Sequence, residues 1–286
     1  MSNKSQPQLQ GQGKERVELE KERLQRKGNE VTLTPVKVYL LFYNLISALL
    51  WGHLLYIVLL FIITPRSTAS SIQHSPSSLF ARLFPSTSST PSPVNQLIEH
   101  FSGSYDFKGL GWKTKYVQSL AALEILHTAL GWVRSPLGTV ASQVFSRVWT
   151  VWGVVEAVPE VSHSSPFFTT MLFAWSLTEV IRYTFYLLSL LNIQSPLVNY
   201  LRYTTFIPLY PIGASSEAFL AFSTLPPILP NVINTRSWGL LEVSRLVMFF
   251  IWWPSLYVLF TYMLKQRKKV LEGKKGKVVG GSNKAR

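Results

Sequence analysis

Long apolar runs constrain this chain more than any other feature of its sequence. The first extends from Val36 to Thr64 and is followed by Pro65. It exceeds the ~20 residues that an α-helix needs to cross the hydrocarbon core of a bilayer. Lipid offers no hydrogen-bond partners to an open backbone, so a run of this length is most compatible with a transmembrane helix. The sequence therefore predicts an integral membrane protein.

Five further apolar stretches follow the first, separated by short turns that contain proline. We expect the spans at 36–64, 115–133, 139–158, 167–191, 197–225 and 240–264. The predicted fold is an all-α bundle of six transmembrane helices within residues 35–264. A short interfacial helix is expected at 96–113, after a Ser/Thr/Pro-rich loop at 66–95 that can bury little apolar surface.

The net charge of +14 is concentrated in the tails at 1–34 and 265–286. Under the positive-inside rule both tails, and so both termini, should face the cytosol, which requires an even number of crossings and puts the 66–95 loop in the lumen. Basic tails also occur in nucleic-acid-binding proteins, but no basic fold with interleaved aromatic residues accompanies them, so we expect no nucleic-acid partner. The chain has no cysteine, which excludes thiolate metal ligands and cysteine nucleophiles.

Ionisable residues recur inside the predicted spans, where an unpaired charge costs roughly 2.5–3.5 kcal/mol on insertion scales. They should therefore face the bundle interior and pair with one another. We expect more than half to form structural ion pairs or to lie near the membrane interface, including Glu156, Glu242 and Arg245 near the span ends, and we expect His127 to partner Glu124. The tryptophans Trp149, Trp152, Trp252 and Trp253 are predicted to be packing residues or interface anchors.

The fifth span contains the least membrane-like stretch. Tyr203, Tyr210 and Glu217 recur at intervals of seven, which places them on nearly one helix face. Tyr210 and Glu217 would lie about 10 Å apart along an ideal helix axis, and Pro211 and Gly213 between them loosen the helix. The pair could bracket a small reacting group, or the kink could be purely structural.

Four segments make the sequence resemble a known family, the 3-hydroxyacyl-CoA dehydratases, also called protein-tyrosine-phosphatase-like proteins. The segments are 123–127 (LEILH), 143–147 (QVFSR), 175–186 and 202–217 (ending YPIGASSE). The resemblance implies a six-span, multi-pass enzyme of the endoplasmic-reticulum membrane. It would convert (3R)-3-hydroxyacyl-CoA to trans-2-enoyl-CoA, the third step of very-long-chain fatty-acid elongation, without a metal or other cofactor.

The family motif places the catalytic pair on Tyr210 and Glu217. By the same resemblance, supporting or substrate-binding positions fall on Arg202, Gly213, Arg182, Arg147 and Glu124. The implied partners are a long-chain 3-hydroxyacyl-CoA, the lipid bilayer, and the condensing, ketoacyl-reducing and enoyl-reducing enzymes of elongation. The CoA phosphates should stay at the cytosolic mouth, near basic residues such as Arg134 or the tails.

Dehydration needs a base for the C2 proton and an acid for the departing C3 hydroxyl. The sequence leaves open which of Tyr210 and Glu217 plays which role. A phosphatase is disfavoured because Thr128 stands in the segment from His127 to Arg134 where a cysteine nucleophile would be needed. The remaining alternative is a non-catalytic membrane scaffold or transporter that uses the same internal charges.

Overall fold

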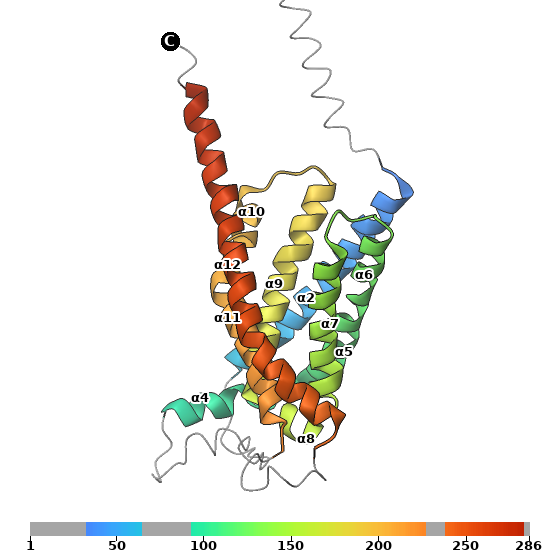
Figure 1. Cartoon of the computed structure of the whole chain (residues 1–286), viewed down its shortest axis with the longest axis vertical. Coiled ribbons are helices and arrows are strands. Elements are labelled where there is room, and N and C mark those ends of the chain that lie inside the picture. Colours follow the sequence, from blue (N-terminus) through green and yellow to red (C-terminus); the bar gives the residue numbers. More distant parts are fainter. Residues whose placement is uncertain (1–32, 65–92, 227–237, 283–286) are drawn as a thin grey trace, which may run out of the picture.

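The structure is a computed structural model that describes residues 33–64, 93–226 and 238–282, and within these ranges it is built of helices without a strand. The predicted loop at 66–95 lies almost wholly outside the described residues, as does most of the tail at 1–34. The helices form one elongated bundle, with α4 lying across one of its ends (Figure 1). Their bounds are α2 Pro35–Ile63, α4 Pro93–Phe101, α5 Leu110–Leu120, α6 Ala122–Ala129, α7 Leu137–Trp149, α8 Pro159–Ser162, α9 Pro166–Leu190, α10 Pro196–Arg202, α11 Phe206–Ser223 and α12 Leu240–Ser282, with a 3₁₀ turn at Phe107–Gly109 and a π-helical turn at Thr150–Val155.

Proline and a preceding hydroxyl residue start three of these helices. The side chain of Thr34 caps α2, that of Ser165 caps α9 and that of Ser195 caps α10, each by accepting a backbone N–H of the first turn. Proline fits the next position because the N–H that it lacks has no partner inside the helix. The prolines at 166 and 196, expected only in turns, therefore mark helix starts.

Helix α9 is the central element of the bundle. It packs on α2 along one side and on α11 along another. The buried core between α2 and α9 includes Trp51, Leu54, Phe168, Met171 and Trp175. Many large apolar side chains of α2 and α12, in contrast, are exposed on the outside of the bundle. An apolar outer surface of this kind is suited to lipid.

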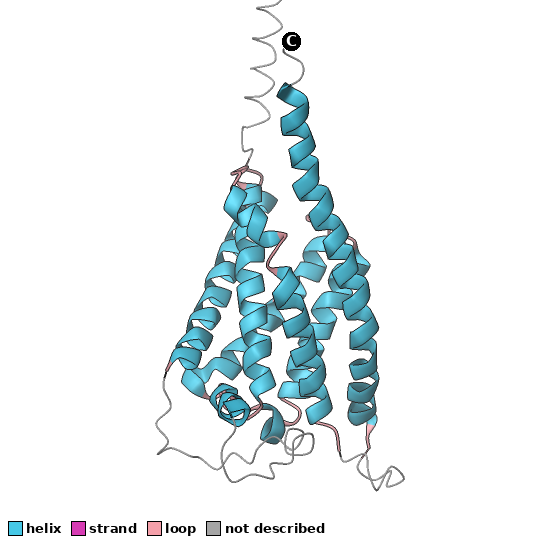
Figure 2. Ribbon diagram, turned by 90° about the vertical axis from the view of Figure 1, so that its left-hand side faces the viewer, coloured by secondary structure: helices cyan, strands magenta, loops and turns pink. Residues whose placement is uncertain are grey.

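Two of the described helices are long and apolar enough to cross a membrane: α2, and α12 over Leu240–Leu271. The predicted first and fourth spans agree with α2 and α9 to within a residue or two. The sixth begins where expected, but its helix continues past 264 to Ser282. The beginning of α2 and the end of α12 lie at the same end of the bundle (Figure 2).

The other three predicted spans are interrupted. The second is divided at Ala121 into α5 and α6, and the third changes to a π-helical turn after Trp149. The fifth was expected as one helix over 197–225, which is wrong, because a turn at 203–205 separates α10 from α11. The interfacial helix expected at 96–113 is also wrong as a single element, since α4 and the 3₁₀ turn share that segment.

Candidate active site

Tyr210 and Glu217 both lie on α11, which remains helical through Pro211. Pro211 has no N–H to donate to the carbonyl of Ile207, so the helix lacks one backbone bond beside Tyr210. Glu217 is buried and Tyr210 is half-buried. The two side chains are separated by two helical turns on nearly one face, as the sequence predicts. Tyr203 does not share that face, because it lies in the turn before α11.

The carboxylate of Glu217 is held by two indole groups. Trp175 of α9 donates its Nε1–H to Oε1 at 2.7 Å, and Trp252 of α12 donates to Oε2 at 3.1 Å. Both tryptophans are buried. Within the described residues, no cation lies within ion-pair distance of Glu217. A buried carboxylate is therefore stabilised here by neutral donors from two neighbouring helices.

Arg147 of α7 is the cation nearest in effect to this pair. Its guanidinium lies over the ring of Trp175, 5.1 Å from the centroid. It is close enough to interact electrostatically with both Tyr210 and Glu217. Arg147 also donates to Oε1 of Glu179, which fixes its position. The indole of Trp175 thus separates a positive charge on its face from a carboxylate at its edge.

Arg147 is one of four charged residues that we call the ion network: Glu124, Arg147, Glu179 and Arg182. Arg182 binds Glu124 through two bonds of 2.6 and 2.7 Å and donates its Nε–H to Glu179 at 2.6 Å. Tyr183 adds a hydroxyl bond of 2.5 Å to Glu124. Two carboxylates and two guanidiniums balance each other, so the network is neutral and joins α6, α7 and α9.

Gly213 lies where α11 approaches α9. A Cβ added to it would be 3.5 Å from Cβ of Ala174 and 3.8 Å from Cδ1 of Trp175. The glycine therefore faces the tryptophan that holds Glu217, at a place where a Cβ fits but a larger side chain would press on that indole.

Arg202 does not join this site. It ends α10, and its guanidinium lies 5.9 Å from the ring centroid of Tyr186. Arg182, which like Tyr186 is on α9, lies 5.8 Å from the centroid of the same ring. Of the supporting residues that the resemblance implies, the structure places Arg147 and Gly213 against Trp175 beside Glu217. It links Arg182 and Glu124 to Arg147 through Glu179, and it leaves Arg202 at the end of the bundle.

His127 is not a partner of Glu124, contrary to the sequence-based prediction. Its Nε2 lies 2.9 Å from the hydroxyl of Tyr39, in a cluster with Tyr43 and Trp132. Glu124 turns to Arg182 instead, because a guanidinium can bind both carboxylate oxygens. The hydroxyl of Thr128 donates to the backbone carbonyl of Glu124, so it is not presented as a nucleophile.

The predicted structural pairs near the span ends are confirmed. Glu156 binds Lys115 at 2.8 Å and accepts the hydroxyl of Tyr105, and Glu242 lies 3.4 Å from Arg245. Arg245 also donates to the carbonyl of Gly153 in the π-helical turn. In the described part of the chain, no group of three or more histidines or acidic residues is arranged to hold a metal ion.

Sequence reasoning missed the tryptophans that bind Glu217. Trp252 was expected to be a packing residue or an interface anchor, and Trp175 was noted only as part of a motif. Both are buried, and a buried indole N–H needs an acceptor. A tryptophan within a predicted span therefore indicates that its N–H needs an acceptor, and a carboxylate on a neighbouring span is a candidate for it.

Comparison with known proteins identifies the family. The family model for the protein tyrosine phosphatase-like protein, PTPLA, matches residues 118–273, which is more than half of the chain. The chain is 38% identical over 156 residues to a probable very-long-chain (3R)-3-hydroxyacyl-CoA dehydratase of Schizosaccharomyces pombe, covering 54% of this chain and 72% of the relative. It is 38% identical over 179 residues to a very-long-chain (3R)-3-hydroxyacyl-CoA dehydratase of Caenorhabditis elegans, covering 58% and 80%.

A third relative, the very-long-chain (3R)-3-hydroxyacyl-CoA dehydratase PASTICCINO 2A of Oryza sativa, is 38% identical over 167 residues, which covers 55% of this chain and 74% of the relative. No solved structure matches. The matched segment contains the ion network, both tryptophans and the Tyr210–Glu217 pair. The chain therefore belongs to the protein tyrosine phosphatase-like (PTPLA) family.

Proposed function

We propose that this protein dehydrates (3R)-3-hydroxyacyl-CoA to trans-2-enoyl-CoA in very-long-chain fatty-acid elongation. The relatives named above bear the name of that reaction. The observation on which the proposal rests is the buried Glu217 carboxylate, bound by two indole N–H groups, on the same helix face as Tyr210. A carboxylate and a phenol supply the two proton-transfer groups that the reaction requires.

In the proposed mechanism, Glu217 is the base and Tyr210 is the acid. Each oxygen of Glu217 already accepts an indole N–H, so the carboxylate is held by donors alone and is positioned to accept a proton rather than to give one. Arg147 interacts electrostatically with Tyr210 and would stabilise the phenolate that forms when its hydroxyl gives up a proton. The sequence alone left this division of roles open.

The proposed proton transfers balance. Glu217 takes the C2 proton, and the C2–H electron pair moves toward the thioester carbonyl, which forms an enolate. The enolate electrons then form the C2=C3 double bond as the C3–O bond breaks. Tyr210 gives its proton to the departing hydroxyl, which leaves as water. Transfer of the proton from Glu217 to the Tyr210 phenolate restores both groups.

The direct test is the dehydration of a long-chain 3-hydroxyacyl-CoA by the purified protein and its variants. Tyr210→Phe and Glu217→Gln keep the side-chain size and remove the proton chemistry, so each should lower kcat by about 10²–10⁴-fold. Tyr257→Phe and Glu160→Gln make the same chemical changes at exposed positions and should retain full activity. Near-normal turnover by Tyr210→Phe or Glu217→Gln would remove that residue from the mechanism.

The division of roles has its own test, the exchange of the C2 hydrogen of the substrate with deuterium from D₂O. Tyr210→Phe retains the base and should still exchange this hydrogen, whereas Glu217→Gln should not. The opposite pattern would make Tyr210 the base.

We also propose a six-pass topology in the endoplasmic-reticulum membrane, with both tails cytosolic and the 66–95 loop lumenal. The positions of the start of α2 and the end of α12 at one end of the bundle support an even number of crossings (Figure 1). The condensing, ketoacyl-reducing and enoyl-reducing enzymes of elongation are the proposed partners. A glycosylation acceptor introduced into the 66–95 loop should be modified in microsomes, and one introduced into either tail should not.

A further inference from the structure

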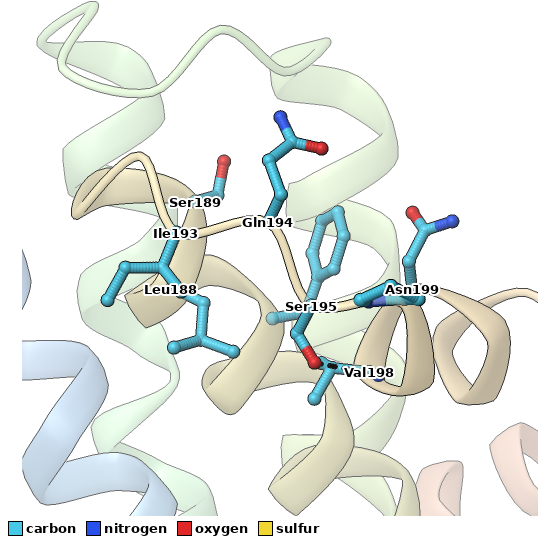
Figure 3. Close-up of a pocket in the computed structure, with 9 residues that line it drawn as sticks. Leu188, Ser189, Ile193, Gln194, Ser195, Val198 and Asn199 are labelled. Atoms are coloured by element: carbon cyan, nitrogen blue, oxygen red, sulfur yellow. Dashed lines mark hydrogen bonds between the residues drawn. The ribbon is translucent and has the colours of Figure 1, made fainter. Parts of the chain in front are cut away.

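A pocket at the connection between α9 and α10 has no role in the proton chemistry described above. It has a volume of about 310 Å³ and is lined by the last turns of α9, the connecting loop and the first turns of α10 (Figure 3). That volume lies at the lower end of the range for small-molecule sites. The α9–α10 connection that lines the pocket lies at the end of the bundle where α2 begins (Figure 1).

The lining combines an apolar floor with uncharged hydrogen-bonding groups. Leu188 and Val198 lie on one side of the connecting segment, and the polar ends of Ser189, Gln194 and Asn199 lie on the other (Figure 3). Phe185 adds an aromatic ring to the wall. Amide side chains and an aromatic ring are the groups that bind a heteroaromatic base, through paired hydrogen bonds and stacking. None of the lining residues is acidic, so the pocket does not repel an anion.

Arg202 lies beside this pocket rather than beside Glu217. It is three residues after Asn199 on α10, so the two side chains are neighbours on one helix face. Throughout the described ranges, no carboxylate lies within ion-pair distance of Arg202, and the contact recorded for its guanidinium is the ring of Tyr186. A planar guanidinium without a carboxylate partner is well suited to a phosphate group.

The pocket is also connected to the proposed active site. The ring of Phe185 lies 6.3 Å from that of Tyr203, in the turn that leads from α10 into α11. Arg202 and Arg182 of the ion network both lie over the ring of Tyr186. The wall of the pocket therefore adjoins the turn that leads into α11, the helix that carries Tyr210.

We propose that this pocket binds the nucleotide end of the CoA thioester, with the adenine among Gln194, Asn199 and Phe185 and a phosphate on Arg202. This inference rests on the proposed function, because it gives a binding site to the nucleotide part of the same acyl-CoA substrate. It gives Arg202, the motif residue that lies apart from the catalytic pair, a part in substrate binding. It also favours Arg202 over Arg134, the exposed arginine at the α6–α7 turn, as the phosphate partner.

The test compares two substrates, a 3-hydroxyacyl-CoA and the corresponding 3-hydroxyacyl-pantetheine thioester, which lacks the nucleotide. The readout is the ratio of kcat/KM for the CoA substrate to kcat/KM for the pantetheine substrate, so that a general loss of folded enzyme cancels. Arg202→Gln should lower this ratio by about tenfold or more, as expected for loss of a charge-assisted hydrogen bond. Asn199→Ala should lower it by roughly threefold to tenfold, and Arg134→Gln should leave it unchanged.

Three results would overturn the proposal: a wild-type protein that uses both substrates equally, an unchanged ratio in Arg202→Gln, or a fall in the ratio with Arg134→Gln instead. If the wild-type protein dehydrates neither thioester, the proposed function fails, and the pocket is tested separately by equilibrium binding of adenosine 3′,5′-bisphosphate. Binding that Arg202→Gln and Asn199→Ala both weaken supports the pocket independently of the reaction. An absence of binding, or binding that neither variant changes, overturns it.

Discussion

The ion network reaches the face of the Trp175 ring and the Glu217 site lies at its edge, and the two regions bind their carboxylates differently. In the network, Glu124 and Glu179 are each bound by guanidinium groups at ion-pair distance. Glu217 receives two neutral indole N–H groups instead. A carboxylate bound by guanidinium groups is a poor proton acceptor, because taking a proton would leave the cations unpaired. A carboxylate held by neutral donors stays ordered and keeps its capacity to take a proton.

Arg147 joins the two regions. It belongs to the network through Glu179, and it lies over the ring whose edge binds Glu217. The network therefore has a positioning function as well as a stabilising one, since it holds the cation that acts on the catalytic pair. The comparison predicts that changes in the network affect mainly stability, whereas changes around Glu217 affect mainly turnover.

The largest stability effect is expected for Arg182→Met. This change removes three hydrogen bonds, leaves the half-buried Glu124 without its bidentate partner and takes one of two guanidinium partners from the buried Glu179. Breaking a buried ion pair on one side typically costs about 3–5 kcal/mol. Unfolding of the purified variant in mixed micelles would measure the loss. Arg134→Met, at an exposed turn, serves as the control and should be as stable as the wild type. Wild-type stability in Arg182→Met would contradict a structural role for the network.

The next largest effect is expected for Trp175→Phe and Trp252→Phe, and it should appear in turnover. Each change removes one N–H donor to Glu217 while keeping an aromatic ring. A hydrogen bond to a charged group contributes about 1.5–3 kcal/mol. Because Trp175 makes the shorter of the two bonds, kcat should fall by about 10–100-fold for Trp175→Phe. KM should change little, because in the proposed mechanism the indole N–H groups bind Glu217 and not the substrate.

The neighbouring Trp253 provides a matched control, since its ring packs on Phe219 and Phe249 and does not bind Glu217. Trp253→Phe should have wild-type kcat. If Trp175→Phe raised KM and left kcat unchanged, the indole would be a substrate contact rather than a group that positions Glu217.

A smaller stability effect is expected for Tyr183→Phe. The variant loses one hydroxyl bond to Glu124, which Arg182 still binds through both oxygens. Hydrogen bonds between membrane helices contribute about 0.6–1.7 kcal/mol, so the loss should lie in that range. Dehydration activity should be retained. A loss of activity without a loss of stability would extend the catalytic site to Tyr183 and contradict the separation of the two regions.

The sequence predicted which residues belong together but not how they pair. Helical spacing placed Tyr210 and Glu217 on one face of α11, and the cost of charge in lipid required the internal charges to meet. Which of these side chains pair depends on how neighbouring helices are rotated and tilted. The sequence of one helix does not specify that arrangement. For that reason His127, three residues from Glu124, pairs with Tyr39 instead.

Helix breaks were the second limit of the sequence. The turn at 203–205 contains Tyr203-Thr204-Thr205 and neither glycine nor proline, so it has no strong local signal. Tertiary packing around Phe185 and Tyr203 accompanies the break. A heptad pattern read across it placed Tyr203 with the catalytic pair, whereas the break leaves Tyr203 beside the pocket at the end of the bundle.

The smallest effect is expected for Gly213→Ala. The added Cβ would lie at ordinary contact distance from Ala174 and Trp175, so it fits without displacing either helix. Alanine also favours the helix over glycine, so stability should be equal to or slightly above that of the wild type. Gly213→Leu would press on Trp175 and should lower kcat through Glu217. If Gly213→Ala lowered kcat as strongly as Trp175→Phe does, packing would not explain the glycine. The substrate itself would then have to approach the α11 backbone at Gly213, which would place the thioester between Tyr210 and Glu217.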